Sequence, residues 1–241
     1  MQKTISQLLN EFSSFNVIIV GDVMVDSYIW GEVNRISPEA PVPVVAQKKS
    51  EYRMGGAANV ARNIKSLGAT PFLCSVIGDD DSGKIFMQLM DDERLPKDGI
   101  LISSERCSTV KTRIISGRHQ LLRIDHEMDD YLSSAQQKEL FSQFTDLCQK
   151  YKIDAVIFQD YDKGVITPDL ISLITEFSNK HHIPVLIDPK KRNFRYYKNA
   201  SLFKPNFKEL VEGLNIQVEK HDFDSVYHAA KCCIPNRVLI W

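Results

Sequence analysis

Residues 16–21 read NVIIVG, a short unbroken apolar run that leads directly into Asp22. Strands that are buried on both faces of a parallel sheet have this near-continuous hydrophobic character. Similar runs recur at 71–78 (PFLCSVIG), 153–158 (IDAVIF) and 183–187 (IPVLI). We therefore expect these runs to be buried strands of one mostly parallel sheet.

Amphipathic helices are predicted between these runs. Apolar residues share one face in 56–67 and in 134–150, and Gly68 suits the position just after the first of these helices. A third helix is expected from Pro168, with Thr167 as its N-cap. Alternating strands and helices predict an α/β fold with a doubly wound, mostly parallel sheet and flanking helices.

Two stretches, about 28–54 and 109–125, interrupt this alternation with β-prone segments that have no helices of their own. The first is split by a Pro-rich turn, and the second has the pattern of a hairpin that turns near Gly117. We expect them to form a small second sheet, a lid or dimerisation layer, within a single domain that spans residues 1–241.

The last five residues, 237–241 (RVLIW), again have the pattern of a buried strand. A doubly wound domain normally continues into a helix that covers such a strand, because an open apolar edge is a liability for the folded state. We therefore expect this chain to be truncated at its C-terminus.

The composition is that of an ordinary globular protein, with 43% hydrophobic residues and 30 Lys+Arg against 31 Asp+Glu. Nucleic-acid binders usually have a basic excess, and no apolar run approaches the roughly 18–20 residues that span a bilayer. The five cysteines form no CxxC pair, which favours reduced thiols. We expect a cytoplasmic protein with neither a nucleic-acid nor a membrane partner.

Polar residues follow the predicted strands, at the edge of the sheet where open α/β folds bind ligands. Asp22 and Asp26 follow the first strand, and their carboxylates could accept hydrogen bonds from sugar hydroxyls or only cap a turn. Gly55 and Gly56 precede a helix and could present N–H groups to an anion or serve only tight packing. Lys163, in the segment DYDKG, could pair with a phosphate or be simply solvated.

The segment KPNFKEL has two interpretations. Asn206 and Glu209 have the spacing of a capping box, which accounts for the pair fully. Alternatively, their side chains lie near a magnesium-bound nucleotide phosphate. The sequence has no HExxH and no Gly-x-Ser-x-Gly, so zinc and serine hydrolases have no support.

A series of motifs resembles the ribokinase-like (PfkB) carbohydrate kinases, in order from about residue 16 to Trp241. These motifs are VGDVMVD, RISPEAPVPVV, GGAANVARNIKSLGA, GDDDSG, TRIISGRHQLLRID, DYDKG, VLIDPK and KPNFKEL. RISPEAPVPVV and DYDKG are most similar to the subgroup of heptose-7-phosphate kinases that are fused to an adenylyltransferase and act in lipopolysaccharide assembly.

The resemblance implies ATP- and Mg²⁺-dependent phosphoryl transfer to the anomeric hydroxyl of D-glycero-D-manno-heptose 7-phosphate, giving the 1,7-bisphosphate. Separately, the free edges of the lid strands favour a homodimer through these strands. The residues implied for the sugar are Asp22, Asp26, Gly55, Gly56 and Asn59. Those that we infer for the substrate phosphate are Lys163 with Lys111 or Arg123. Those implied for the nucleotide are Asn206, Phe207, Lys208 and Glu209, with Glu209 at the metal directly or through water.

The sequence departs from the family at one point. The family's catalytic base is an Asp in a Gly-Ala-Gly-Asp motif, which does not occur here, and the resemblance places it beyond Trp241. We therefore name no catalytic base. Two alternatives stay open: a non-catalytic fragment that binds sugar phosphate or pairs with a full-length subunit, and a PfkB kinase for another sugar or a nucleoside.

Overall fold

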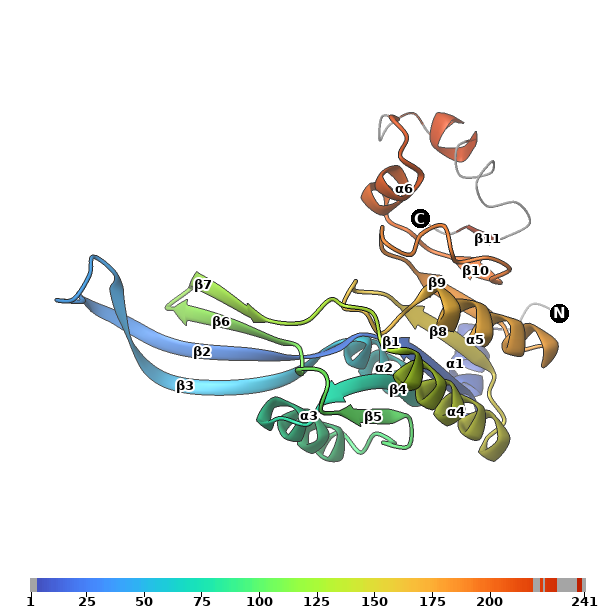
Figure 1. Ribbon diagram of the computed structural model, residues 1–241, viewed down its shortest axis with the longest axis horizontal. Coiled ribbons are helices and arrows are strands. Elements are labelled where there is room, and N and C mark those ends of the chain that lie inside the picture. The colour runs from blue at the N-terminus through green and yellow to red at the C-terminus, as the bar shows by residue number, and fades with distance from the viewer. Residues whose placement is uncertain (1–3, 219–221, 223, 229–237, 240–241) are drawn as a thin grey trace.

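The computed structural model describes residues 4–218, 222, 224–228 and 238–239. Its main sheet has seven strands in the order β11-β10-β9-β8-β1-β4-β5, and every adjacent pair is parallel (Figure 1). The strands are β1 (Asn16–Gly21), β4 (Thr70–Gly78), β5 (Ile100–Ser103), β8 (Ala155–Gln159), β9 (Val185–Asp188), β10 (Leu202–Phe203) and β11 (Val238–Leu239). The predicted parallel sheet is confirmed.

Helices cover both faces of this sheet. They are α1 (Ile5–Phe12), α2 (Ala57–Ser66), α3 (Asp81–Asp92), α4 (Ser134–Lys150), α5 (Pro168–Lys180) and α6 (Phe207–Leu214). Ile18 and Val20 of β1 belong to the core that includes buried residues of α4 and α5, whereas Val17 and Ile19 belong to the core with α2 and α3. Alternate residues of β1 therefore serve opposite cores, which explains the unbroken apolar run and confirms the doubly wound arrangement.

The sheet has a topological switch between β1 and β8. From β1 the chain proceeds outward through β4 and β5, and then returns to the other side of β1 to build β8, β9 and β10. In open α/β sheets the crevice at the carboxyl ends of the two strands that flank such a switch is the usual ligand site. The segments that follow β1 and β8 are therefore the first place to look for function.

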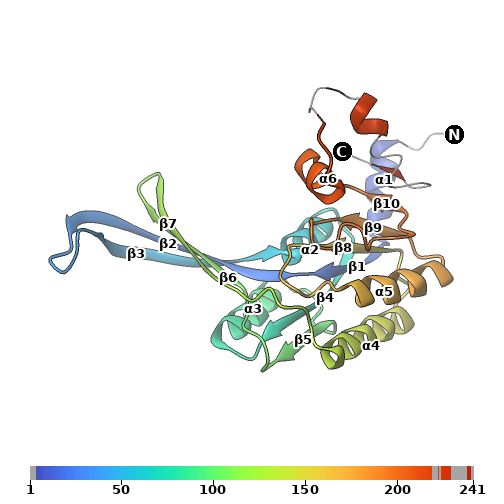
Figure 2. The same ribbon diagram turned by 45° about the horizontal axis from the view of Figure 1, so that its top comes forward.

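The second sheet is a long arm that projects from the body (Figures 1 and 2). It contains β2 (Val23–Ile36), β3 (Pro43–Gly56), β6 (Val110–Ser116) and β7 (His119–His126), in the order β3-β2-β6-β7. The predicted inserted strands are confirmed, and Gly117 lies in the hairpin turn with φ 59°. The start of β2 differs from the prediction, because the chain passes from Asp22 into the arm without a turn, and Asp26 consequently lies within a strand.

Only part of the predicted C-terminal strand can be compared with the structure. Val238 and Leu239 form β11 beside β10, whereas residues 237, 240 and Trp241 lie outside the described residues. Among the helices of the described part of the chain, none has the length and apolar character needed to cross a bilayer.

Candidate active site

Asp22 is a buried support for the segment that follows β8. Its side chain accepts three backbone hydrogen bonds, from the N–H groups of Tyr161 (2.9 Å), Lys163 (3.2 Å) and Val165 (3.0 Å). The residue is only 1% exposed. The residue pattern left a sugar contact and a turn cap open, and the family resemblance implied the sugar; in the structure the buried carboxylate of Asp22 holds the backbone of the DYDKG segment.

The backbone of Asp22 also holds the helix that follows the two glycines. Its carbonyl oxygen accepts a 2.9 Å hydrogen bond from the N–H of Ala57, the first residue of α2. Gly56 has φ 61°, and a β-carbon there would collide with the same carbonyl oxygen. A glycine is therefore required at this position. Asp22 thus connects the end of β1, the DYDKG segment and the start of α2.

The DYDKG segment is held firmly from its other side as well. Asp160 is 1% exposed and accepts hydrogen bonds from the Tyr197 hydroxyl (2.7 Å) and the Asn193 amide (3.1 Å). The guanidinium of Arg106 donates to the carbonyl oxygen of Lys163 at 2.6 Å. These contacts fix the backbone around Lys163, so its side chain is presented from a rigid support.

Two aspartates in this region, Asp22 and Asp162, have raised pKa values because their surroundings disfavour the charged carboxylate. Burial, reinforced by the nearby charge of Asp160, raises the pKa of Asp22 to about 6 against the three amide hydrogen bonds that lower it. Burial likewise raises the pKa of Asp162 to about 6, with Asp160 and Asp22 acting in the same direction. One oxygen of Asp162 is buried with no hydrogen-bond partner among the described residues.

We expect Asp162→Asn to stabilise the protein at pH 8 by roughly 1 kcal/mol, allowing for partial solvent screening. Because the folded-state pKa is raised, the native state binds the proton more tightly than the unfolded chain. The contribution of Asp162 to stability is therefore fully present below about pH 4 and is lost as pH rises through 6, and the asparagine side chain removes this loss. Asn also tolerates the φ of 57° at this position.

Urea unfolding from pH 4 to pH 8 measures this effect. The control is Asp146→Asn, an exposed aspartate of α4, which should leave the pH profile unchanged. If Asp162→Asn raised the free energy of unfolding equally at pH 4 and at pH 8, the raised pKa of Asp162 would not be the cause.

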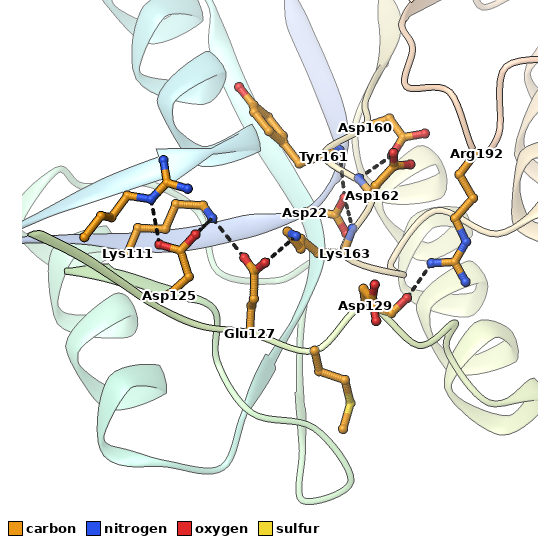
Figure 3. Close-up of polar contacts among 12 residues, drawn as sticks. Asp22, Lys111, Asp125, Glu127, Asp129, Asp160, Tyr161, Asp162, Lys163 and Arg192 are labelled. Atoms are coloured by element: carbon orange, nitrogen blue, oxygen red, sulfur yellow. Dashed lines mark hydrogen bonds and ion pairs between the residues drawn. The ribbon is translucent and has the colours of Figure 1, made fainter. Parts of the chain in front are cut away.

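The predicted phosphate-binding cations lie together, linked by two carboxylates (Figure 3). Lys163 Nζ lies 2.7 Å from Oε1 of Glu127, and Lys111 Nζ lies 2.9 Å from Oε2 of the same side chain. Asp125 contacts Lys111 at 3.1 Å and Arg123 at 2.9 Å. We call these five residues the charged cluster, and it joins the arm to the DYDKG segment.

Asp26 lies beside the charged cluster on the same face of the arm. It is in register with Lys111, and Lys111 is in register with Asp125, so the three side chains point to one side. Asp26 accepts a 2.6 Å hydrogen bond from Arg113. A β-carbon at Gly55 would collide with the Asp26 carboxylate, so this glycine makes room for it.

Asn59 and the 206–209 segment complete the set of predicted residues. Asn59 is exposed in the first turn of α2. Asn206 and Glu209 form the reciprocal capping box at the start of α6, with hydrogen bonds of 2.8 and 2.9 Å, which confirms the structural interpretation of this pair. Lys208 is exposed and Phe207 packs against the main core.

Glu209 was also expected at a metal. One of its carboxylate oxygens accepts from the Asn206 N–H, and the other contacts the ammonium of Lys190. Within the described residues, no group of three His, Cys, Asp or Glu side chains is placed to hold a metal ion. The side chains described do not form a protein-built Mg²⁺ cage, which needs several free oxygen ligands.

Several site residues were missed by the sequence analysis. Asp125 and Glu127 continue the alternation of Arg123 with apolar Leu122 and Ile124, so a period-two pattern could have found them. Arg113 has no comparable signal. Its position beside Asp26 follows from the parallel pairing of β2 with β6, which is invisible in the sequence.

Comparison with solved structures shows which class of fold this is. Phosphofructokinase-2 from Escherichia coli, in a tetrameric inhibited form, superposes with a TM-score of 0.66 at 18% identity, covering 90% of this chain and 68% of that one. Arabidopsis thaliana ribokinase complexed with ribose and ATP gives a TM-score of 0.64 at 14% identity, covering 93% and 71%. The fold is that of the ribokinase-like kinases.

Sequence comparison shows the family. Residues 14–240 match the model of the pfkB family carbohydrate kinases, and the chain belongs to this family. The bifunctional protein HldE of Helicobacter pylori strain J99 is 42% identical over 205 residues, which is 85% of this chain and 44% of HldE. HldE of Caulobacter sp. strain K31 is 40% identical over 216 residues, covering 90% and 43%. The chain spans less than half the length of these relatives.

Proposed function

We propose that this chain is the kinase part of a sugar-phosphate kinase that transfers a phosphoryl group from ATP to the anomeric hydroxyl of D-glycero-D-manno-heptose 7-phosphate. The observation that supports it most directly is Lys163. It is carried on a segment fixed by Asp22 and Arg106, at the switch point between β1 and β8, in a chain about two-fifths identical to HldE proteins. We also propose that the reaction takes place in the cytoplasm.

The sugar and its phosphate have separate groups of residues in this proposal. Asp26 accepts a hydrogen bond from a sugar hydroxyl, and the backbone at Gly55 and Gly56 and the amide of Asn59 line the same side. Lys163 and Lys111 bind the phosphate as point charges, and Arg123 adds a planar guanidinium that can donate paired hydrogen bonds to it. Because the phosphate anchors the far end of the sugar, it sets which hydroxyl meets the donor.

ATP is proposed as the donor because ribokinase of the same fold was solved with ATP. We place the segment 206–209 on the nucleotide side. Lys190 contacts Glu209, and its ammonium lies 5.9 Å from the ring centre of Tyr161 in the DYDKG segment. Mg²⁺ is expected from the family resemblance alone. Phosphoryl transfer depends mainly on positioning and charge stabilisation, which is the contribution of these residues.

The proposal is tested by ³¹P NMR of the protein, as the cell makes it, with ATP and a panel of acceptors. We expect conversion of heptose 7-phosphate to the 1,7-bisphosphate, with heptose lacking the phosphate at least 100-fold less efficient. Equal turnover of heptose and heptose 7-phosphate would show that the charged cluster does not recognise the phosphate of the acceptor. Turnover of a different sugar phosphate alone would keep the class and change the acceptor.

We further propose a homodimer through the apolar face of the arm. Tyr52, Leu122 and Ile124 are 43%, 53% and 50% exposed, and the strand register places them on the face opposite Asp26 and Lys111. Exposed apolar side chains on one face of a sheet favour association with a second copy.

The combined variant Leu122→Asp/Ile124→Asp is expected to be monomeric by light scattering at concentrations at which the wild type is dimeric. Arg118→Asp, in the turn of the same hairpin and therefore off this face, should stay dimeric. A monomeric wild type, or a dimer that the double substitution leaves intact, would contradict this interface.

A further inference from the structure

Glu127 has an unusual position in the charged cluster. Each of its two carboxylate oxygens contacts a different lysine, one from strand β6 of the arm and one from the segment after β8. The side chains of Lys111, Lys163 and Glu127 are 17%, 19% and 27% exposed, so the three groups are partly shielded from water but remain within reach of a dissolved anion. A carboxylate that bridges two lysines occupies the place that a phosphate group would take between them.

The charges of the cluster support the same interpretation. Three cations, Lys111, Arg123 and Lys163, surround two carboxylates, Glu127 and Asp125, which leaves one positive charge unbalanced. When Glu127 moves out, two positive charges remain, which matches the charge of a phosphate monoester dianion near pH 7. The net charge of the cluster therefore neutralises a phosphate dianion only after the Glu127 carboxylate has moved away.

The backbone is held on both sides of Glu127: His126, the last residue of β7, pairs with Val110 of β6, and Arg106 contacts the residues that follow. Arg106 donates hydrogen bonds to the carbonyl oxygens of Met128 (3.3 Å) and Asp130 (2.7 Å), just after Glu127. Among the described residues, the partners of the Glu127 carboxylate are the two lysines. Rotation about its side-chain bonds would release both lysines without changing the backbone.

We propose that Glu127 is an internal competitor for the phosphate site: it holds Lys111 and Lys163 while the site is empty, and the phosphate of the sugar displaces it. This rests on the proposed role of Lys163 in binding phosphate. The consequence is selectivity. An isolated phosphate must compete with Glu127 using only its own contacts, whereas a sugar phosphate gains additional contacts through its hydroxyls, so abundant inorganic phosphate is kept out.

The test is the affinity for inorganic phosphate, measured by calorimetry at low ionic strength with Glu127→Gln, which keeps the shape and removes the charge. Loss of a negative charge a few ångströms from the bound anion should tighten phosphate binding by about tenfold. The matched control is Glu139→Gln, an exposed glutamate on α4, which removes the same charge elsewhere and should change the affinity less than twofold.

A second variant guards against indirect effects. The double variant Glu127→Gln/Lys163→Ala should lose the tenfold gain in phosphate affinity, because that gain depends on the ammonium of Lys163. Unchanged or weaker phosphate binding by Glu127→Gln would overturn the proposal and make Glu127 a permanent organiser of the two lysines. If Glu127→Gln binds phosphate more tightly but the protein does not phosphorylate heptose 7-phosphate, the competitor role stands and the proposed acceptor is wrong.

Discussion

Replacing Lys163 with alanine is expected to weaken the binding of heptose 7-phosphate by about 100-fold and to leave folding intact. A charge-assisted contact to phosphate contributes roughly 1.5–3 kcal/mol, which corresponds to about 10- to 150-fold in affinity. The segment around Lys163 is held through its backbone N–H and carbonyl, which the substitution retains. The loss should therefore appear in recognition and not in stability.

Calorimetric titration with the phosphorylated and the unphosphorylated heptose separates the two contributions. We expect Lys163→Ala to affect only the phosphorylated sugar, and Lys180→Ala, in the last turn of α5, to affect neither. An equal loss for both sugars would show that Lys163 acts on the sugar ring or on the shape of the site.

Replacing Asp22 with alanine is expected to lower the free energy of unfolding by about 3–5 kcal/mol. Three backbone N–H groups would lose their acceptor in a buried region, and each orphaned donor costs roughly 1–3 kcal/mol, partly offset by removal of a buried charge. Urea unfolding measures this directly. Asp22→Asn should fall between the wild type and alanine, because it keeps one acceptor oxygen.

Asp26→Asn is the matched comparison, four residues further along the chain. Its carboxylate lies on the arm and contacts Arg113, so we expect a raised KM or a lowered kcat with an almost unchanged melting temperature. If Asp22→Ala keeps its stability but loses sugar binding, Asp22 is a direct contact, and the positioning role assigned to it is wrong.

The sequence was sufficient for the parts of the molecule that depend on local patterns. NVIIVG had to be a strand buried on both faces, and Thr167 with Pro168 had to begin a helix, because these signals depend on neighbouring residues alone. The capping box at Asn206 is local in the same sense, and the structure contains it with both hydrogen bonds.

The role of Asp22 could not be predicted, because its partners lie 139 to 143 residues further along the chain. An aspartate at the end of a strand looks the same in the sequence whether it meets a ligand or three amide groups. The bridge between Lys111 and Lys163 through Glu127 likewise depends on how the arm meets the body. Such contacts follow from tertiary arrangement and leave no mark on periodicity or spacing.

The central claim is that the sheet edge between β1 and β8 binds a sugar phosphate, and a crystal structure of the protein with heptose 7-phosphate tests it most directly. We predict the phosphate in contact with Lys163 Nζ, a sugar hydroxyl on Asp26 and the Glu127 carboxylate turned away from both lysines. A phosphate bound at another surface, with the Lys111–Glu127–Lys163 bridge unchanged, would contradict the account.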